Sequence, residues 1–268
     1  MSPPLSVCVL ACNEEAELER CLLSVAWADE IVVMVDDKSR DSTERVARRL
    51  ASRVERRVYA GDVEQKRSCV ALAKHDWVLV LDPDEVVSAS LAESIRVRLE
   101  DEVKSELGAA VNSRAVGYRV NRSTFHLGRW IRYGDFYPDW KLRLFRRSYA
   151  HWVGRDPHGR VEVDGPVGSL DGELLHYSYR DLADQIDRIQ FFSDQAADAL
   201  VREGAEFRIR DLVLRPPARF ARSYLLRRGF RDGMPGFIIA VASAFYVFLK
   251  YAKHWERSRM SGERDRRG

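Results

Sequence analysis

The first 85 residues alternate between two hydrophobic periodicities. Short apolar runs at residues 5–10, 31–35, 54–59 and 77–81 have the length and composition of β-strands. Between them, apolar side chains recur every three or four residues, as Leu18, Leu22 and Val25 do after the first run. This alternation of strands and helices predicts an α/β domain of Rossmann-like type, with a mostly parallel central sheet and helices on both faces.

Capping residues mark where the helices should begin. Asn13 can cap the first helix, Asp41 or Ser42 the second and Ser88 a fourth, and the third covers residues 65–74. Residues 115–180 then resemble shorter strands and loops, and residues 181–203 return to a helical pattern that begins at Asp181.

The charge distribution changes the picture at Arg208. From there to Gly268 the chain carries fifteen Lys or Arg and five Asp or Glu, a net charge of +10. The first 207 residues hold 29 basic and 36 acidic side chains, a net charge of −7. A basic end on an acidic body predicts contact with an anionic surface, either a membrane or a nucleic acid.

An apolar segment divides this basic region. Residues 234–249 contain no charge, and arginines and lysines lie on both sides. A helix of sixteen residues is about 24 Å long, short of the roughly 30 Å hydrocarbon core, so we expect the segment to lie on a membrane instead of crossing it. The alternative is an apolar helix packed on the α/β domain. The segment argues against a nucleic-acid arm, and no helix-turn-helix signature is present.

Composition and termini exclude other classes. With 46% hydrophobic and 32% charged residues, the 268-residue chain is neither disordered nor a multi-span membrane protein. No basic region precedes the first apolar run, so we expect no signal peptide. The four cysteines, none in a CxxC pair, are expected to be buried thiols in a reducing, cytoplasmic compartment.

Polar side chains follow the ends of three predicted strands. Asn13, Asp37 and Asp82 come directly after them, at the sheet edge where open α/β folds bind ligands. Asp82-Pro83-Asp84-Glu85 offers carboxylates that can hold Mg²⁺ together with phosphate oxygens. The alternative is a solvated acidic turn before the next helix. Because no GxGxxG or GxxxxGK[ST] loop is present, a bound nucleotide would be held through a metal.

Ordered blocks along most of the chain resemble glycosyltransferase family 2, which has the GT-A fold. They are SVCVLACNEE at 6–15, WADEIVVMVDDKSRDST at 27–43, DWVLVLDPDE at 76–85, LGRWIRYGDFYPDWKLRLFR at 127–146 and HYSY at 176–179. The later blocks, with residues 229–253, resemble the branch that contains lipopolysaccharide-core β-glucosyltransferases.

The resemblance implies inverting transfer of a hexose from a nucleotide sugar, UDP-glucose being favoured, with Mg²⁺ or Mn²⁺. By this resemblance, Asn13 and Glu14 border the nucleotide, Asp37 contacts the nucleotide base, and Lys66 lies near the donor. Asp82 and Asp84 match the Asp-x-Asp motif, and Asp84 is the direct metal ligand. Pro83 replaces the small residue usual between the two aspartates, which the turn should tolerate because Pro only fixes φ.

The general base does not follow from the resemblance. Inverting transfer requires a carboxylate that takes the proton of the acceptor hydroxyl. Where family members carry Glu or Asp after the matched His158, this chain has Gly159. Asp156 is the first candidate because it lies in the same loop, and Asp139 and Glu162 are alternatives that could equally be arginine partners.

Other residues have two interpretations. His176 can be a third metal ligand or a histidine hydrogen-bonded in a strand. Arg122, Arg143 and Arg146 can bind a diphosphate or an anionic acceptor, as can His158, or the arginines can pair with aspartates. A set of aromatic residues can either stack on sugar rings or pack under a loop: Trp130, Tyr133, Phe136, Tyr137 and Trp140.

These patterns predict a division of the chain. Residues 1–205 form the catalytic domain, with a donor half at 1–104 and an acceptor half at 105–205; residues 206–260 form a helical membrane-associating region, and 261–268 a disordered tail. The predicted enzyme is peripheral on the inner face of the cytoplasmic membrane, with a lipid-linked saccharide acceptor, an anionic membrane surface as partner and no nucleic acid. The alternatives are a polyprenyl-phosphate glycosyltransferase and a non-catalytic nucleotide-sugar-binding protein.

Overall fold

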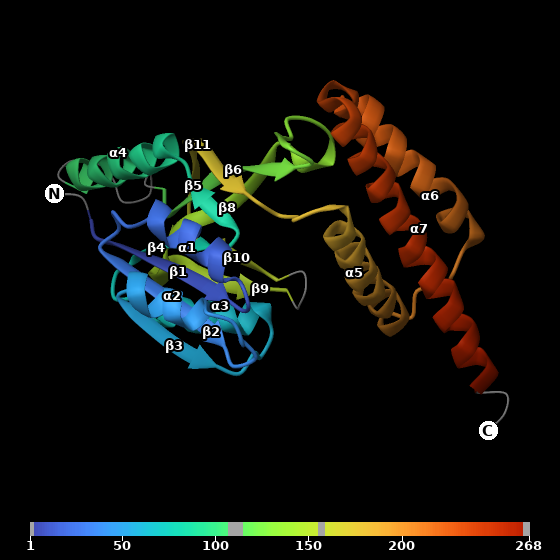
Figure 1. The fold of residues 1–268 in the computed structure, drawn as a ribbon, viewed down its shortest axis with the longest axis horizontal. Helices are drawn as coiled ribbons and strands as arrows, with labels where there is room; N and C mark the ends of the chain where they lie inside the picture. Colours follow the sequence, from blue (N-terminus) through green and yellow to red (C-terminus); the bar gives the residue numbers. More distant parts are fainter. Residues whose placement is uncertain (1–2, 107–114, 155–158, 265–268) are drawn as a thin grey trace. The chain divides into compact units, whose positions relative to one another are not determined.

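The computed structural model describes residues 3–106, 115–154 and 159–264. It divides the chain into two compact units, coloured along the sequence in Figure 1. Unit 1 comprises Met1–Arg122 and Asp139–His176, and unit 2 comprises Ser123–Pro138 and Tyr177–Gly268.

The sheet of unit 1 has the strand order β3-β2-β1-β4-β8-β6-β11-β5. The strands are β1 (Leu5–Ala11), β2 (Glu30–Asp36), β3 (Arg53–Arg57), β4 (Trp77–Leu81), β5 (Glu85–Val87), β6 (Gly117–His126), β8 (Asp139–Arg146) and β11 (Val167–His176). β3, β2, β1 and β4 pair in parallel, as predicted. β8 runs antiparallel to β4 and β6, and β5 to β11, so the sheet is mixed.

Helices cover both faces of this sheet, as predicted. On one face, α1 (Glu15–Ser24), α2 (Thr43–Leu50) and α4 (Ala89–Glu106) pack on alternate strand residues such as Val7, Val33 and Leu79. On the other face, α3 (Asp62–Leu72) and the hairpin of β9 (Ala150–Val153) and β10 (Arg160–Val163) pack on the intervening residues, such as Cys8 and Val32. A short 3-10 helix, η3 (Arg147–Tyr149), precedes β9.

The capping predictions have mixed outcomes. Ser88 Oγ accepts a hydrogen bond from Leu91 N, and Asp181 accepts one from Asp184 N, as expected. Asp41 Oδ1 accepts from Thr43 N at the start of α2. The prediction for Asn13 is wrong: Glu14 occupies the cap position, while Asn13 adopts a left-handed φ of 57° and its side chain accepts from Arg40 N instead.

Unit 2 is mainly helical. It contains the end of β6 with β7 (Arg129–Trp130), η2 (Gly134–Phe136), α5 (Leu182–Arg202), α6 (Ile209–Ala221), the π-helical turn η4 (Arg222–Leu226), η5 (Gly229–Asp232) and α7 (Gly233–Arg264). Two buried carboxylates hold its turns. Asp135 pairs with Arg219 and Arg227, and Asp232 accepts hydrogen bonds from the backbone amides of Arg132 and Tyr133.

α7 is twice as long as the uncharged segment, with 32 residues, and α6 packs along it (Figure 1). Among the described residues, Gly229–Arg259 is one stretch long and apolar enough to cross a membrane by length and composition. The length estimate from residues 234–249 alone was therefore too short. The helix also extends to Arg264, so part of the tail predicted to be disordered is helical.

Candidate active site

The parallel strands bring the predicted nucleotide-side residues to one sheet edge. Ala11 is in register with Val35, and Val9 with Leu81, so the carboxyl ends of β1, β2 and β4 lie together. Asn13, Asp37 and Asp82 follow these ends within two residues. Asp37 is exposed and pairs with Arg56 at 3.0 Å.

Asp82 begins an alternating chain of charges at this edge. Its Oδ1 lies 3.0 Å from Lys66 Nζ, and its Oδ2 lies 2.5 Å from Arg143 Nη2. The same Arg143 nitrogen lies 2.5 Å from Glu85 Oε1, and Glu85 has no exposed side-chain surface. Asp82 and Glu85 are also joined through the backbone, because Glu85 Oε2 accepts from Asp82 N.

Arg122 extends this charge chain to β8. Its guanidinium lies 3.3 Å from Glu85 Oε1 and 2.7 Å from Asp139 Oδ2, and Lys141 pairs with the other Asp139 oxygen at 3.0 Å. With Asp62 beside Lys66 at 3.2 Å, four acids and four bases alternate without a break. We call these eight residues, from Asp62 to Lys141, the charge network.

Within the network, neighbouring opposite charges favour the ionised forms of Asp82, Lys66 and Asp139. Burial alone disfavours a charge on Asp82, but Arg143 and Lys66 outweigh it and hold the pKa well below its usual range. Burial likewise opposes charge on Lys66, yet Asp82 raises its pKa. For Asp139, Arg122 and Lys141 outweigh burial and lower the pKa, which weakens this carboxylate as a general base.

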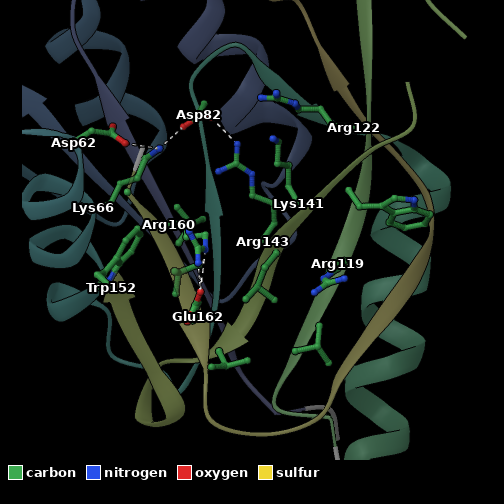
Figure 2. A pocket seen from close by; sticks show the side chains of 17 residues that line it. Asp62, Lys66, Asp82, Arg119, Arg122, Lys141, Arg143, Trp152, Arg160 and Glu162 are labelled. Carbon is green, nitrogen blue, oxygen red and sulfur yellow. Dashed lines mark hydrogen bonds and ion pairs between the residues drawn. The ribbon is translucent and has the colours of Figure 1, made fainter. Parts of the chain in front are cut away.

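A pocket of about 690 Å³ lies along the network, and its wall includes six basic side chains and three acidic ones. Figure 2 shows Lys66, Asp82 and Arg143 near one end, Trp152, Arg160 and Glu162 on one side, and Arg119 on the other. Glu162 pairs with Arg160 at 2.5 Å. Arg119 is exposed and has no ion pair among the described residues, so it is free to meet an anion.

Asp84 and His176 come together beside the network. His176 Nε2 lies 3.3 Å from Asp84 Oδ2, and both side chains are largely buried, with 10% and 15% exposure. The pairing of β11 with β5 sets this contact, since His176 is in register with Glu85. No group of three His, Cys, Asp or Glu side chains that could hold a metal occurs in the described part of the chain.

The structure joins most predicted residues and adds others. Lys66, Asp82, Arg122, Arg143 and Asp139 belong to one network, whereas Asp156 and His158 lie outside the described residues. Sequence reasoning missed the central role of Glu85 and the pocket side chains Arg119, Lys141, Trp152 and Arg160. The alternation of Asp139, Lys141 and Arg143 along one strand was a signal for part of this set.

Residues 6–160 match the sequence family described as glycosyl transferase family 2. The chain belongs to this family.

Relatives of this glycosyltransferase extend over nearly the whole chain. It is 29% identical to the lipopolysaccharide core biosynthesis glycosyltransferase LpsC of Rhizobium meliloti, over 95% of this chain and 93% of that protein. It is 28% identical to an uncharacterised glycosyltransferase of Rickettsia typhi, over 95% and 87% of the two chains.

Structural comparison confirms the GT-A fold. The mannosyltransferase PcManGT from Pyrobaculum calidifontis, solved in complex with GDP-Man and Mn²⁺, superposes with a TM-score of 0.52. The alignment covers 95% of this chain and 88% of that one, with 17% identity. The predicted family and fold are both confirmed.

The structure also explains the departure of this glycosyltransferase at Gly159. A Cβ atom placed there would lie 1.8 Å from Val63 Cγ2 on α3, so the position has no space for a side chain. An aspartate or glutamate at 159 would require Val63 or the backbone to move. A base, if the reaction uses one, must therefore stand elsewhere.

Glu14 gives a pH-dependent prediction. Its burial, together with Asp84, Glu17 and Asp82, raises the pKa of Glu14 from 4.5 to about 7, although Cys12 N opposes this by donating a hydrogen bond. Between these values the folded state binds more protons than the unfolded state, so Glu14 lowers stability as pH rises. Over this window the loss is up to roughly 3 kcal/mol.

Glu14→Gln should remove this loss. We expect the variant to gain stability over the wild type progressively from pH 4.5 to 8, measured by urea unfolding at each pH. The exposed Glu93→Gln is the control and should leave the profile parallel to that of the wild type. A Glu14→Gln profile parallel to the wild type would show that the Glu14 pKa is not raised.

Proposed function

We propose that the chain is an inverting, metal-dependent hexosyltransferase, which moves glucose from UDP-glucose to a lipid-linked saccharide. The observation that carries this proposal is the buried charge network beside the Asp84–His176 pair, at the strand ends and along a basic pocket. The name of LpsC supports lipopolysaccharide core or a related surface glycan as the product. The GDP-Man and Mn²⁺ complex of PcManGT supports a nucleotide-sugar donor and a divalent cation.

The Asp84–His176 pair fits a divalent cation. Asp84 Oδ2 and His176 Nε2 lie 3.3 Å apart, so one carboxylate oxygen and one imidazole nitrogen could hold the same cation. Mg²⁺ or Mn²⁺ would complete its shell with donor phosphates and water, and would neutralise the departing diphosphate. Both Asp82 oxygens already contact cationic side chains, so we assign direct ligation to Asp84 and place Asp82 on the donor side, with any metal contact secondary.

The remaining residues receive the following roles in the proposal. Asn13, Glu14 and Asp37 border the nucleotide, and Lys66 lies beside the donor phosphates. Arg122 and Arg143 act through the carboxylates that they hold, and His158 is assigned to contact with the acceptor or a phosphate. Arg119, which the sequence did not single out, meets anionic groups of the acceptor.

In the transfer step, a base removes the proton of the acceptor hydroxyl, and its oxygen bonds to the anomeric carbon. The nucleotide diphosphate leaves with the electron pair of the broken bond. Asp156 is the first candidate base; Glu162 lines the pocket but pairs with Arg160, and Asp139 is held by Arg122 and Lys141. We place catalysis in residues 1–205 and membrane contact in residues 206–260, at the inner face of the cytoplasmic membrane.

The base assignment is tested by Asp156→Asn. Transfer to acceptor should fall by about 10²–10⁴-fold, because the proton of the attacking hydroxyl has no acceptor. The assay follows metal-dependent release of nucleotide from UDP-glucose with extracted membrane lipids as the acceptor, and UDP affinity should stay the same. Glu162→Gln and Asp139→Asn are the matched variants, and a loss confined to one of them would move the role to that residue.

A second candidate is a polyprenyl-phosphate glycosyltransferase. Gly159 favours it, since an acceptor phosphate attacks without a strong base, and the six basic pocket residues suit an anionic acceptor. Product analysis with isolated polyprenyl phosphate separates the two: glucose on the lipid phosphate supports this candidate, and its absence supports the saccharide acceptor. Nucleotide binding without transfer to either acceptor would indicate a non-catalytic binding protein.

A further inference from the structure

Unit 2 exposes a continuous apolar stripe on α7. Its large side chains recur every three or four residues and are all at least 41% exposed: Met234, Phe237, Val241, Phe245, Phe248 and, one heptad later, Trp255. Residues at this spacing lie on the same side of a helix. From the first to the last, the stripe is about 31 Å long.

Two charged residues near the end of α7, Lys253 and Arg257, do not interrupt this stripe, because they face α5. Lys253 Nζ donates to Gln190 and Ser193 and pairs with Asp194 at 3.0 Å. Arg257 pairs with Asp194 and with Asp198. The apolar surface of the helix therefore extends beyond residues 234–249, and Lys253 and Arg257 are already paired with α5.

The turn between α6 and α7 adds a second apolar group to the start of the stripe. Leu226 is 80% exposed, Leu225 57% and Phe230 48%. Buried carboxylates fix this turn. The fully buried Asp232 accepts hydrogen bonds from the backbone amides of Arg132 and Tyr133, and Asp135 pairs with Arg227. The exposed leucines are thus presented by a fixed backbone.

Positive charge surrounds the same turn. The exposed side chains of Arg222 and Arg228 have no hydrogen bond or ion pair among the described residues. Fixed apolar side chains next to unpaired guanidiniums are complementary to one environment, the boundary between acyl chains and anionic headgroups of a bilayer. A second protein copy would leave these arginines facing each other across a two-fold interface.

We propose that the α6–α7 turn and the α7 stripe form the membrane-docking surface, with α7 lying in the plane of an anionic bilayer. The turn inserts Leu225, Leu226 and Phe230, and the arginines contact lipid phosphates. A lying helix leaves the ion pairs between α7 and α5 in water, whereas a spanning helix would carry them into hydrocarbon. The inference rests on the proposed membrane location and is independent of the proposed transfer reaction.

Vesicle flotation of the full-length protein tests this surface. The vesicles contain phosphatidylcholine with or without 30% phosphatidylglycerol, and circular dichroism monitors folding. Leu226→Ser with Phe230→Ser should lower the bound fraction at least tenfold. Arg222→Gln with Arg228→Gln should remove the preference for anionic vesicles. Leu23→Ser, at a comparably exposed leucine of unit 1, is the control and should bind as the wild type does.

Four results would overturn the inference. If the wild type binds neither kind of vesicle, the membrane location is refuted as well. Nucleotide release by the same preparation would show that the proposed transfer reaction is unaffected by this result. Normal flotation of the Leu226/Phe230 variant would place the docking surface elsewhere. A dimer in solution that this variant dissociates, without effect on vesicles, would show that the surface joins two copies. Resistance of membrane-bound protein to alkaline carbonate extraction would show that α7 spans the bilayer.

Discussion

Replacing Arg143 with methionine is expected to lower the free energy of unfolding by up to about 3–5 kcal/mol, because the change removes the cation shared by Asp82 and the buried Glu85 and leaves each with one partner, Lys66 and Arg122. One Arg143 nitrogen contacts both groups at 2.5 Å, and the side chain is only 10% exposed. Methionine keeps much of the apolar contact of the stem, so the loss reports on charge. Urea unfolding followed by circular dichroism measures it.

The difference in stability between wild type and Arg143→Met should depend on pH in a defined direction. The depressed pKa of Asp82 stabilises the wild type above the usual carboxylate range, and that contribution is lost as pH falls through the folded value. In Arg143→Met, Asp82 loses one of the two cations that lower its pKa, so protonation of Asp82 costs the variant less than the wild type. The gap between wild type and variant should therefore narrow below about pH 4.

Two further variants isolate the buried pair. Lys141→Met lies two residues earlier on β8 but is 41% exposed and pairs with Asp139, so it should cost about 1 kcal/mol or less. Adding Glu85→Gln to Arg143→Met should restore part of the lost stability, because one of the two neighbouring negative charges is removed. If Arg143→Met is no less stable than Lys141→Met, the network does not hold the fold in this way.

The parallel half of the sheet was predictable because each of its strands corresponds to a local pattern of residues in the sequence. β1, β2 and β4 are apolar runs buried on both faces, and each is followed by the polar residue that reaches the site. The sequence placed Asn13 at the correct sheet edge because it follows β1. Its capping role was wrong because its left-handed backbone accompanies a hydrogen bond from Arg40 N to its side chain.

The charge network could not be predicted in the same way. Arg143 and Asp82 are 61 residues apart in sequence, and they meet only because β8 pairs antiparallel with β4. The clash at Gly159 also depends on tertiary structure, since it comes from Val63 on another element. Local sequence therefore identified the chemical groups, and the pairing of distant strands decided which of them neutralise each other.

Replacing Asp84 with asparagine is expected to abolish metal-dependent turnover, lowering the rate of nucleotide release from UDP-glucose by at least about 100-fold. A cation that neutralises the leaving diphosphate contributes several kcal/mol, and each 1.36 kcal/mol changes the rate tenfold. Asparagine keeps the size of Asp84 and can still hydrogen-bond His176, so folding should be preserved. The assay is a manganese titration of nucleotide release.

Metal binding separates this role of Asp84 from a purely structural one. In Asp84→Asn, calorimetry with Mn²⁺ and UDP should show weaker affinity for the metal, and His176→Gln should weaken it in the same direction because both atoms face one position. Asp62→Asn is the matched control: this aspartate also lines the site, but it contacts Lys66 and should leave the manganese dependence unchanged. If Asp84→Asn keeps its turnover and Asp82→Asn is inactive, Asp82 would be assigned as the metal ligand instead of Asp84. That outcome would require Lys66 or Arg143 to release its Asp82 oxygen when the donor binds.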